Sequence, residues 1–144
     1  MDEILGFFDS NVLVAASLPE HVHFAASSAR LVRYRNGGGA CAAHTLAEVY
    51  NTLTRRAAGY GMPPTDASMI VKHAAATYRL ITLTAAETAR TIEDAAQQGL
   101  AGSIVFDALL IACARKANAK FIYTSNVRHV RRIAPDLASR ILEP

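Results

Sequence analysis

The sequence has 144 residues, the length of about one domain. Apolar residues account for 51% and charged residues for 19%, which excludes a disordered tail because such segments combine low hydrophobicity with high net charge. Eight glycines and five prolines are too few for a collagen-like or low-complexity chain. We therefore expect a single globular domain over residues 1–144.

The formal net charge of +3 is distributed unevenly along the chain. Residues 103–144 contain seven basic and three acidic side chains, whereas residues 1–102 contain eight basic and nine acidic ones. A mild positive charge does not by itself indicate a nucleic-acid partner. It does place the positive field in the last third of the sequence.

The two cysteines, Cys41 and Cys113, belong to no CxxC motif and no Cys/His cluster. A zinc site or disulfide framework is therefore not indicated, and we expect both thiols to be buried and reduced. Residues 1–3 lack the basic start of a signal peptide. The longest apolar run, residues 104–114, is too short to cross a bilayer. We expect a cytoplasmic protein with no membrane association.

Short apolar runs alternate with stretches of helical period along the chain. In order, the predicted elements are strand 4–8, helices 12–17 and 19–35, strand 40–43, helices 46–58 and 66–78, strand 79–83, helix 85–98 capped by Thr84, helix 103–118 capped by Ser103, strand 120–123, a short basic helix after residue 126, and edge strand 139–142. This alternation predicts an α/β domain with a mostly parallel sheet. In such sheets, sites form beyond the carboxyl ends of the strands, near a change of strand order.

Three acidic residues occur in surroundings where an unpaired carboxylate is costly. Asp9 directly follows the apolar strand 4–8, and Asp107 lies in a helix that is apolar almost all round. Each acid also has a structural explanation. Asp9 would accept backbone N–H bonds in the turn, with Ser10 or Asn11 as the helix cap. Glu48 would close a capping box with Thr45, and Asp107 would be favoured by the dipole of its helix.

A divalent cation would explain all three acids together. No basic residue near them in sequence is an obvious buried partner, and three carboxylates at one end of a sheet repel one another unless a cation neutralises them. An all-oxygen ligand set suits Mg²⁺ or Mn²⁺. We therefore expect Asp9, Glu48 and Asp107 to form a metal site.

Four segments in this order resemble the PIN domain, and in particular the small bacterial ribonuclease toxins of the VapC type. They are residues 8–14 (FDSNVLV), 46–53 (LAEVYNTL), 106–112 (FDALLIA) and 123–129 (YTSNVRH). The resemblance implies a three-layer α/β/α domain with a five-stranded, mostly parallel sheet. It also implies a Mg²⁺- or Mn²⁺-dependent endoribonuclease, the toxin of a type II toxin–antitoxin pair, which hydrolyses RNA by metal-activated water and leaves 5′-phosphate and 3′-hydroxyl ends.

The resemblance assigns candidate roles to particular residues. The three core acids of the family match Asp9, Glu48 and Asp107, which would bind the metal and act in catalysis. Asn126 matches a fourth catalytic position where many relatives carry Asp, and this departure puts a second metal in doubt. A further departure is His129, where relatives often have Asp, and no role is assigned to it. The candidate substrate-binding residues beside the site are Asn11, Thr124 and Arg128.

The resemblance also implies protein partners. A cognate antitoxin would bind an apolar groove between helices, to which helix 19–35 would contribute Phe24, Leu31 and Val32, although these side chains fit ordinary core packing equally well. A homodimer is a further expectation. Two other functions stay open: a catalytically weak or silent PIN module that binds RNA or a protein partner, and a metal-independent ribonuclease that uses histidine pairs and works in EDTA.

Overall fold

A computed structural model of the chain describes residues 2–57 and 59–144. Its centre is a five-stranded sheet in the order β3-β2-β1-β4-β5, in which all neighbouring strands are parallel. The strands are β1 Gly6–Phe8, β2 Gly39–Ala42, β3 Arg79–Ile81, β4 Phe121–Tyr123 and β5 Ile141–Leu142. The helices are α1 Ser10–Ala16, α2 Phe24–Arg33, α3 Ala43–Thr54, α4 Pro64–Thr77, α5 Ala85–Gln97, α6 Ile104–Lys116 and α7 Val127–Ile133, followed by a 3-10 helix over Pro135–Arg140.

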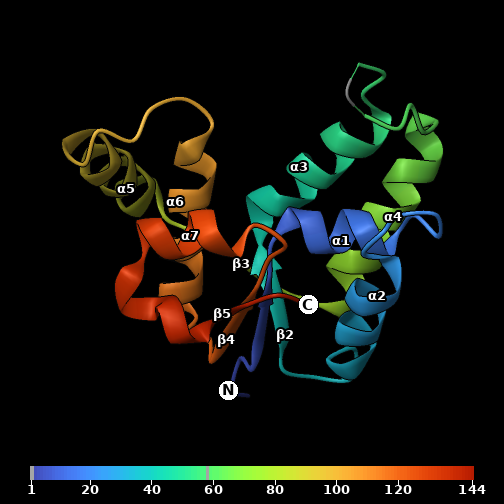
Figure 1. Ribbon diagram of the computed structural model, residues 1–144, viewed down its shortest axis with the longest axis horizontal. Coiled ribbons are helices and arrows are strands. Elements are labelled where there is room, and N and C mark those ends of the chain that lie inside the picture. The colour runs from blue at the N-terminus through green and yellow to red at the C-terminus, as the bar shows by residue number, and fades with distance from the viewer. Residues whose placement is uncertain (1, 58) are drawn as a thin grey trace.

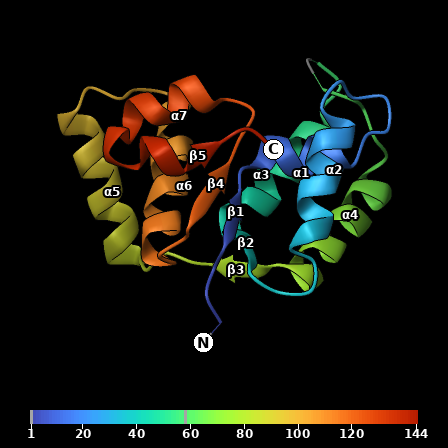
Figure 2. The ribbon, with the colours of Figure 1, turned by 60° about the horizontal axis from the view of Figure 1, so that its bottom comes forward.

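Helices cover both faces of the sheet, as Figures 1 and 2 show. Helices α1 to α4 lie on one side, and α5 to α7 lie on the other. Successive side chains of a strand point to opposite faces, so Phe7 packs with Leu110 of α6 while Phe8 packs with Val12 and Leu53 of the opposite layer. The predicted three-layer α/β/α fold is confirmed.

The strand order reverses next to β1, the central strand. From β1 the chain passes to β2 and β3 on one side and then returns to β4 on the other side. Phe8 at the end of β1 is paired in register with Tyr123 at the end of β4. Asp9 and Thr124 therefore emerge side by side at the reversal, where α/β sheets form their binding sites.

An aromatic cluster fills the layer beneath α2 and α4. The Phe8 ring stacks on Tyr123 at 5.8 Å between centroids and meets the edge of Tyr78 at 5.4 Å. The hydroxyl groups of Tyr34 and Tyr123 are buried and 3.0 Å apart. A Cβ atom at Gly39 would lie 2.8 Å from the Tyr78 ring, so glycine is required there for close packing of the rings on β2.

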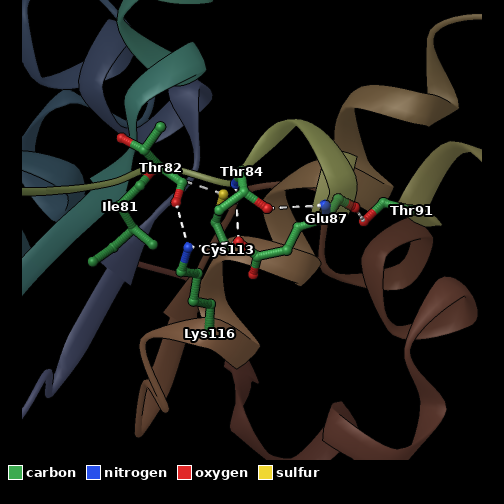
Figure 3. A network of polar contacts seen from close by, with 7 residues as sticks. All are labelled: Ile81, Thr82, Thr84, Glu87, Thr91, Cys113 and Lys116. Atoms are coloured by element: carbon green, nitrogen blue, oxygen red, sulfur yellow. Dashed lines mark hydrogen bonds and ion pairs between the residues drawn. The ribbon is translucent and has the colours of Figure 1, made fainter. Parts of the chain in front are cut away.

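Polar contacts tie the segment after β3 to the C-terminal end of α6 (Figure 3). Lys116 Nζ donates to the Thr82 carbonyl at 2.8 Å and to Glu87 Oε1 at 2.7 Å. Thr84 caps α5 as predicted, and it forms a reciprocal capping box with Glu87. These contacts anchor the end of α6 opposite to the one that carries Asp107.

Several predicted boundaries are wrong, for identifiable reasons. Residues 19–23 form turns, closed by hydrogen bonds from His21 N to Leu18 O and from Phe24 N to His21 O, both 2.9 Å, so α2 begins at Phe24 rather than at residue 19. Ser103 precedes α6 but makes no side-chain capping bond. The 3-10 helix occupies the first half of the predicted strand 139–142, and β5 the second half.

A further boundary error concerns the helix predicted over residues 46–58. Helix α3 begins at Ala43 and ends at Thr54, and position 58 lies outside the described residues. Thr45 therefore lies inside the helix, fully buried, rather than at its N-cap. The two cysteines are buried and unpaired, as predicted.

Replacing Tyr34 by Phe should destabilise the fold by about 1–2 kcal/mol, because it leaves the buried Tyr123 hydroxyl without its partner. The double change Tyr34→Phe with Tyr123→Phe should cost less than the sum of the two single changes, since no hydroxyl is then stranded. Urea denaturation measures both, with exposed Tyr60→Phe as the control. Strictly additive losses would contradict this role of the pair.

Candidate active site

Asp9 is a buried carboxylate held by hydrogen bonds at the strand-order reversal. It is 6% exposed and occupies the N-cap position of α1. Its Oδ1 accepts from the Ser10 amide at 2.7 Å, and its Oδ2 accepts from the Thr124 hydroxyl at 2.8 Å. Burial raises the pKa of Asp9, while the bonds from Thr124 and Ser10 oppose that rise. The expected backbone N–H bond is present, but Asp9 itself, rather than Ser10 or Asn11, is the cap of the helix.

Asn11 joins the loops that follow β1 and β4. Its Nδ2 donates to Thr124 Oγ1 at 3.2 Å and to Asp9 Oδ2 at 3.3 Å, and its Oδ1 accepts from the Ser125 amide at 3.1 Å. Thr124 is fully buried, and its hydroxyl oxygen also accepts from the Asn126 amide at 3.1 Å. In this structure Asn11 and Thr124 therefore position Asp9, while their contact with substrate stays a prediction.

Glu48 lies on α3, one turn beyond His44. Burial, followed by the charges of Asp9 and Asp107, raises the pKa of Glu48 to about 7. The capping box expected from Thr45 is not formed, because Thr45 is fully buried within the helix and its Oγ1 has no hydrogen-bond partner in the described part of the chain. The Glu48 carboxylate is thus not engaged in capping and lies near the other two acids.

Asp107 lies in the first turn of α6, as predicted. Burial, followed by the charge of Asp9, raises the pKa of Asp107, and His129 acts in the opposite direction. Its Oδ2 is 3.3 Å from His129 Nε2 on α7, and the two side chains are 25% and 32% exposed. His129 is distant from Asp107 in sequence, so the expectation about basic residues near these acids in sequence does not cover this contact.

His44 is the second histidine at the site, and sequence reasoning missed both. Its Nε2 lies 3.4 Å from Glu48 Oε1 but has no hydrogen-bond partner among the described residues. Burial lowers the pKa of His44, and a hydrogen bond with the backbone of Phe106 opposes that shift. The spacing of His44 four residues before Glu48 on a helix could have indicated this pair. No local signal pairs Asp107 with His129.

Asn126 and Arg128 lie at the entrance to α7, next to the loop that contains Thr124. Both are exposed, and Asn126 occupies the N-cap position without making a side-chain capping bond. Their catalytic and substrate roles stay predictions.

The donor set fits a divalent cation in kind, because three carboxylates supply only hard oxygen ligands. They are close enough for the charge of Asp9 to raise the pKa values of Glu48 and Asp107, and for the charge of Asp107 to raise that of Glu48. Within residues 2–57 and 59–144, however, no three His, Cys, Asp or Glu side chains are gathered into the geometry of a metal site. Metal binding by Asp9, Glu48 and Asp107 is therefore a proposal that requires side-chain movement.

An apolar groove of about 480 Å³ lies between α1, α2, α3 and α4. Leu31 and Val32 of α2 line it as predicted, whereas Phe24 does not. Val32 is 54% exposed. Other lining side chains include Leu13, Leu46, Val49 and Ile70.

In the described chain, every helix is too short or too polar to cross a membrane.

The fold is that of a known domain class. A sequence model of the PIN domain matches residues 6–134, and the chain belongs to this family. Among solved structures, it is similar to the Mycobacterium tuberculosis toxin VapC20, which is described as cleaving the sarcin–ricin loop. The TM-score is 0.69 and the identity 16%, over 88% of this chain and 94% of that chain.

A second similar structure is VapBC2 from Rickettsia felis bound to a DNA fragment from their promoter. The TM-score is 0.64 and the identity 16%, over 96% of this chain and 98% of that chain. At this identity the two likenesses establish the shared fold. A comparison with curated protein sequences finds no match.

Glu48→Gln should make the protein more stable at pH 8 and change little at pH 5. The pKa of Glu48 is about 7 in the fold against an ordinary 4.5, so stability falls as pH rises from 4.5 to 7 because the folded state loses its extra proton. Because Glu48 is partly exposed, solvent screening reduces this effect. We expect Glu48→Gln to raise the free energy of unfolding at pH 8 by about 1–2 kcal/mol.

Urea denaturation at a series of pH values without divalent ions measures this difference. Glu93→Gln on the exposed surface of α5 is the matched control. An identical pH dependence of stability in wild type and Glu48→Gln would contradict the electrostatic account of the site.

Proposed function

We propose that this PIN domain is a Mg²⁺- or Mn²⁺-dependent endoribonuclease. The observation that carries the proposal is the buried Asp9, fixed by Thr124 and Ser10, whose charge raises the pKa of both Glu48 and Asp107. A protein gains nothing in stability from three mutually repelling carboxylates, whereas a cation bound among them would relieve the repulsion. Perturbed acids in one place are typical of catalytic sites.

The roles of the residues follow from their positions. Asp9, Glu48 and Asp107 would hold the cation, which when bound supplies Lewis-acid stabilisation of phosphate charge and a lowered pKa of water. Asn126 would orient the attacking water through its amide oxygen, and Arg128 would contact a phosphate. Because water rather than the ribose 2′-hydroxyl attacks, the products would carry 5′-phosphate and 3′-hydroxyl ends.

We further propose that the chain is the toxin of a type II toxin–antitoxin pair in the cytoplasm. Its fold is shared with a sarcin–ricin-loop-cleaving toxin and with a VapBC2 structure bound to promoter DNA. The groove between α1 and α4 has the apolar lining and accessible Val32 that an antitoxin helix would use. A homodimer stays an expectation from the family.

Asp9→Asn and Asp107→Asn should each lower RNA cleavage by about 100-fold or more, because each change removes a negative ligand and its charge. The assay follows total RNA with Mg²⁺ or Mn²⁺ and maps the product ends. Asp94→Asn on the exposed surface of α5 is the matched control and should cleave like wild type.

Other outcomes of this assay would overturn the proposal. Cleavage that persists in EDTA and leaves 2′,3′-cyclic phosphates would indicate histidine-based chemistry instead. RNA binding by wild type without cleavage would indicate a silent PIN module.

Val32→Asp should weaken antitoxin binding by about 10-fold or more, because it places a charge in an apolar groove. RNA cleavage by the isolated chain should stay unchanged. Isothermal titration with the small protein encoded beside this chain measures the affinity. Val22→Asp, at an 86% exposed position outside the groove, is the control. Equal binding by both variants would place the antitoxin elsewhere.

A further inference from the structure

Phe106 is an exposed aromatic side chain at the edge of the acidic site. It is 47% exposed and directly precedes Asp107 in the first turn of α6. Residues four and seven positions further along a helix lie on the same face, and here these are Leu110 and Cys113, which are 2% and 1% exposed. Phe106 therefore belongs to the face that packs on the sheet, but it lies a turn beyond the buried part of that face.

The backbone of Phe106 is fixed against α3. A hydrogen bond joins it to His44, whose Nε2 lies 3.4 Å from Glu48 Oε1. Phe106 is thus connected to Glu48 through His44 and to Asp107 through the chain itself. Phe106 is therefore an exposed aromatic residue next in sequence to one of the three carboxylates and hydrogen-bonded through its backbone to the histidine beside another.

A ring in this place suits a nucleobase. Every base has a flat aromatic face, and stacking on a protein ring requires no particular base. Stacking also requires the base to be free of its partner and of one neighbour in the strand. Charged and polar ligands gain little from an exposed phenyl ring, whereas a base gains contact over a whole face.

Resting on the proposed ribonuclease activity, we propose that Phe106 is a stacking platform for an unpaired nucleobase next to the cleaved phosphate. The ring contributes binding to the nucleotide and leaves the chemistry to the carboxylates. The acidic cluster would then act on the phosphate, while Phe106 favours RNA in which the neighbouring base can leave the base stack of the RNA strand.

The test compares two proteins on three substrates. The substrates are an RNA oligonucleotide with a single cleavage site and the same RNA with an abasic nucleotide beside the cut, on each side in turn. Phe106→Ala should lower kcat/KM on the intact RNA by about 10- to 100-fold. On the abasic RNA that removes the stacked base, Phe106→Ala and wild type should cleave at nearly equal rates.

Two further variants separate stacking from folding. Phe106→Tyr keeps a flat ring and should restore cleavage of the intact RNA, whereas Phe106→Leu keeps apolar packing and should not. Ile92→Ala on α5, at a position of similar exposure (48%), should behave like wild type. Equal losses by Phe106→Ala on intact and abasic RNA at both positions would overturn the stacking role while leaving the nuclease proposal intact.

If the wild-type chain binds RNA without cleaving it, the same variants can be compared by their RNA-binding affinity. A 2-aminopurine placed at the affected position should then be quenched by wild type and Phe106→Tyr but not by Phe106→Ala or Phe106→Leu. Quenching that is independent of residue 106 would overturn the platform. Absence of both cleavage and binding by wild type would overturn the proposed function and this inference together.

Discussion

The hydrogen bond from the Thr124 hydroxyl to Asp9, 2.8 Å long and buried, joins the two halves of the site. Asp9 directly follows β1 and Thr124 directly follows β4, and these strands are neighbours only because the strand order reverses between them. Asn11 extends the connection to Ser125. The position of the carboxylate, the start of α1 and the entrance to α7 all depend on this contact, since each is attached to one of its two partners.

Electrostatics at this end of the sheet is unfavourable within the protein alone. Burial raises the pKa values of Asp9, Glu48 and Asp107, and the charge of Asp9 raises those of Glu48 and Asp107 further. His44 and His129 lie close to these acids and oppose the rise at Asp9 and Asp107. The cost falls on the folded state above neutral pH. Without a positive charge among them, these carboxylates destabilise the folded state. A bound cation or a basic side chain of a partner would therefore stabilise the protein at this site.

Much of the site could be predicted because its residues stand out locally. Asp9 after an apolar strand and Asp107 in an apolar helix are conspicuous, and the parallel sheet follows from the alternation of elements. His129 could not be paired with Asp107, since their contact depends on how α7 packs against α6. The capping box at Thr45 was predicted wrongly because α3 begins three residues earlier than its polar pattern suggests. Metal binding, cleavage and substrate contacts stay predictions.

The pairing of β1 with β4 also has a consequence during synthesis. The Asp9 and Thr124 side chains are separated by 115 positions in sequence, so closing this contact requires almost the entire chain, and such long-range contacts form late. A growing polypeptide that has not yet emerged beyond β4 lacks one wall of the site. Premature termination anywhere before residue 121 would therefore yield fragments that retain Asp9, and in longer cases Glu48 and Asp107, without the neighbour that fixes Asp9 in place.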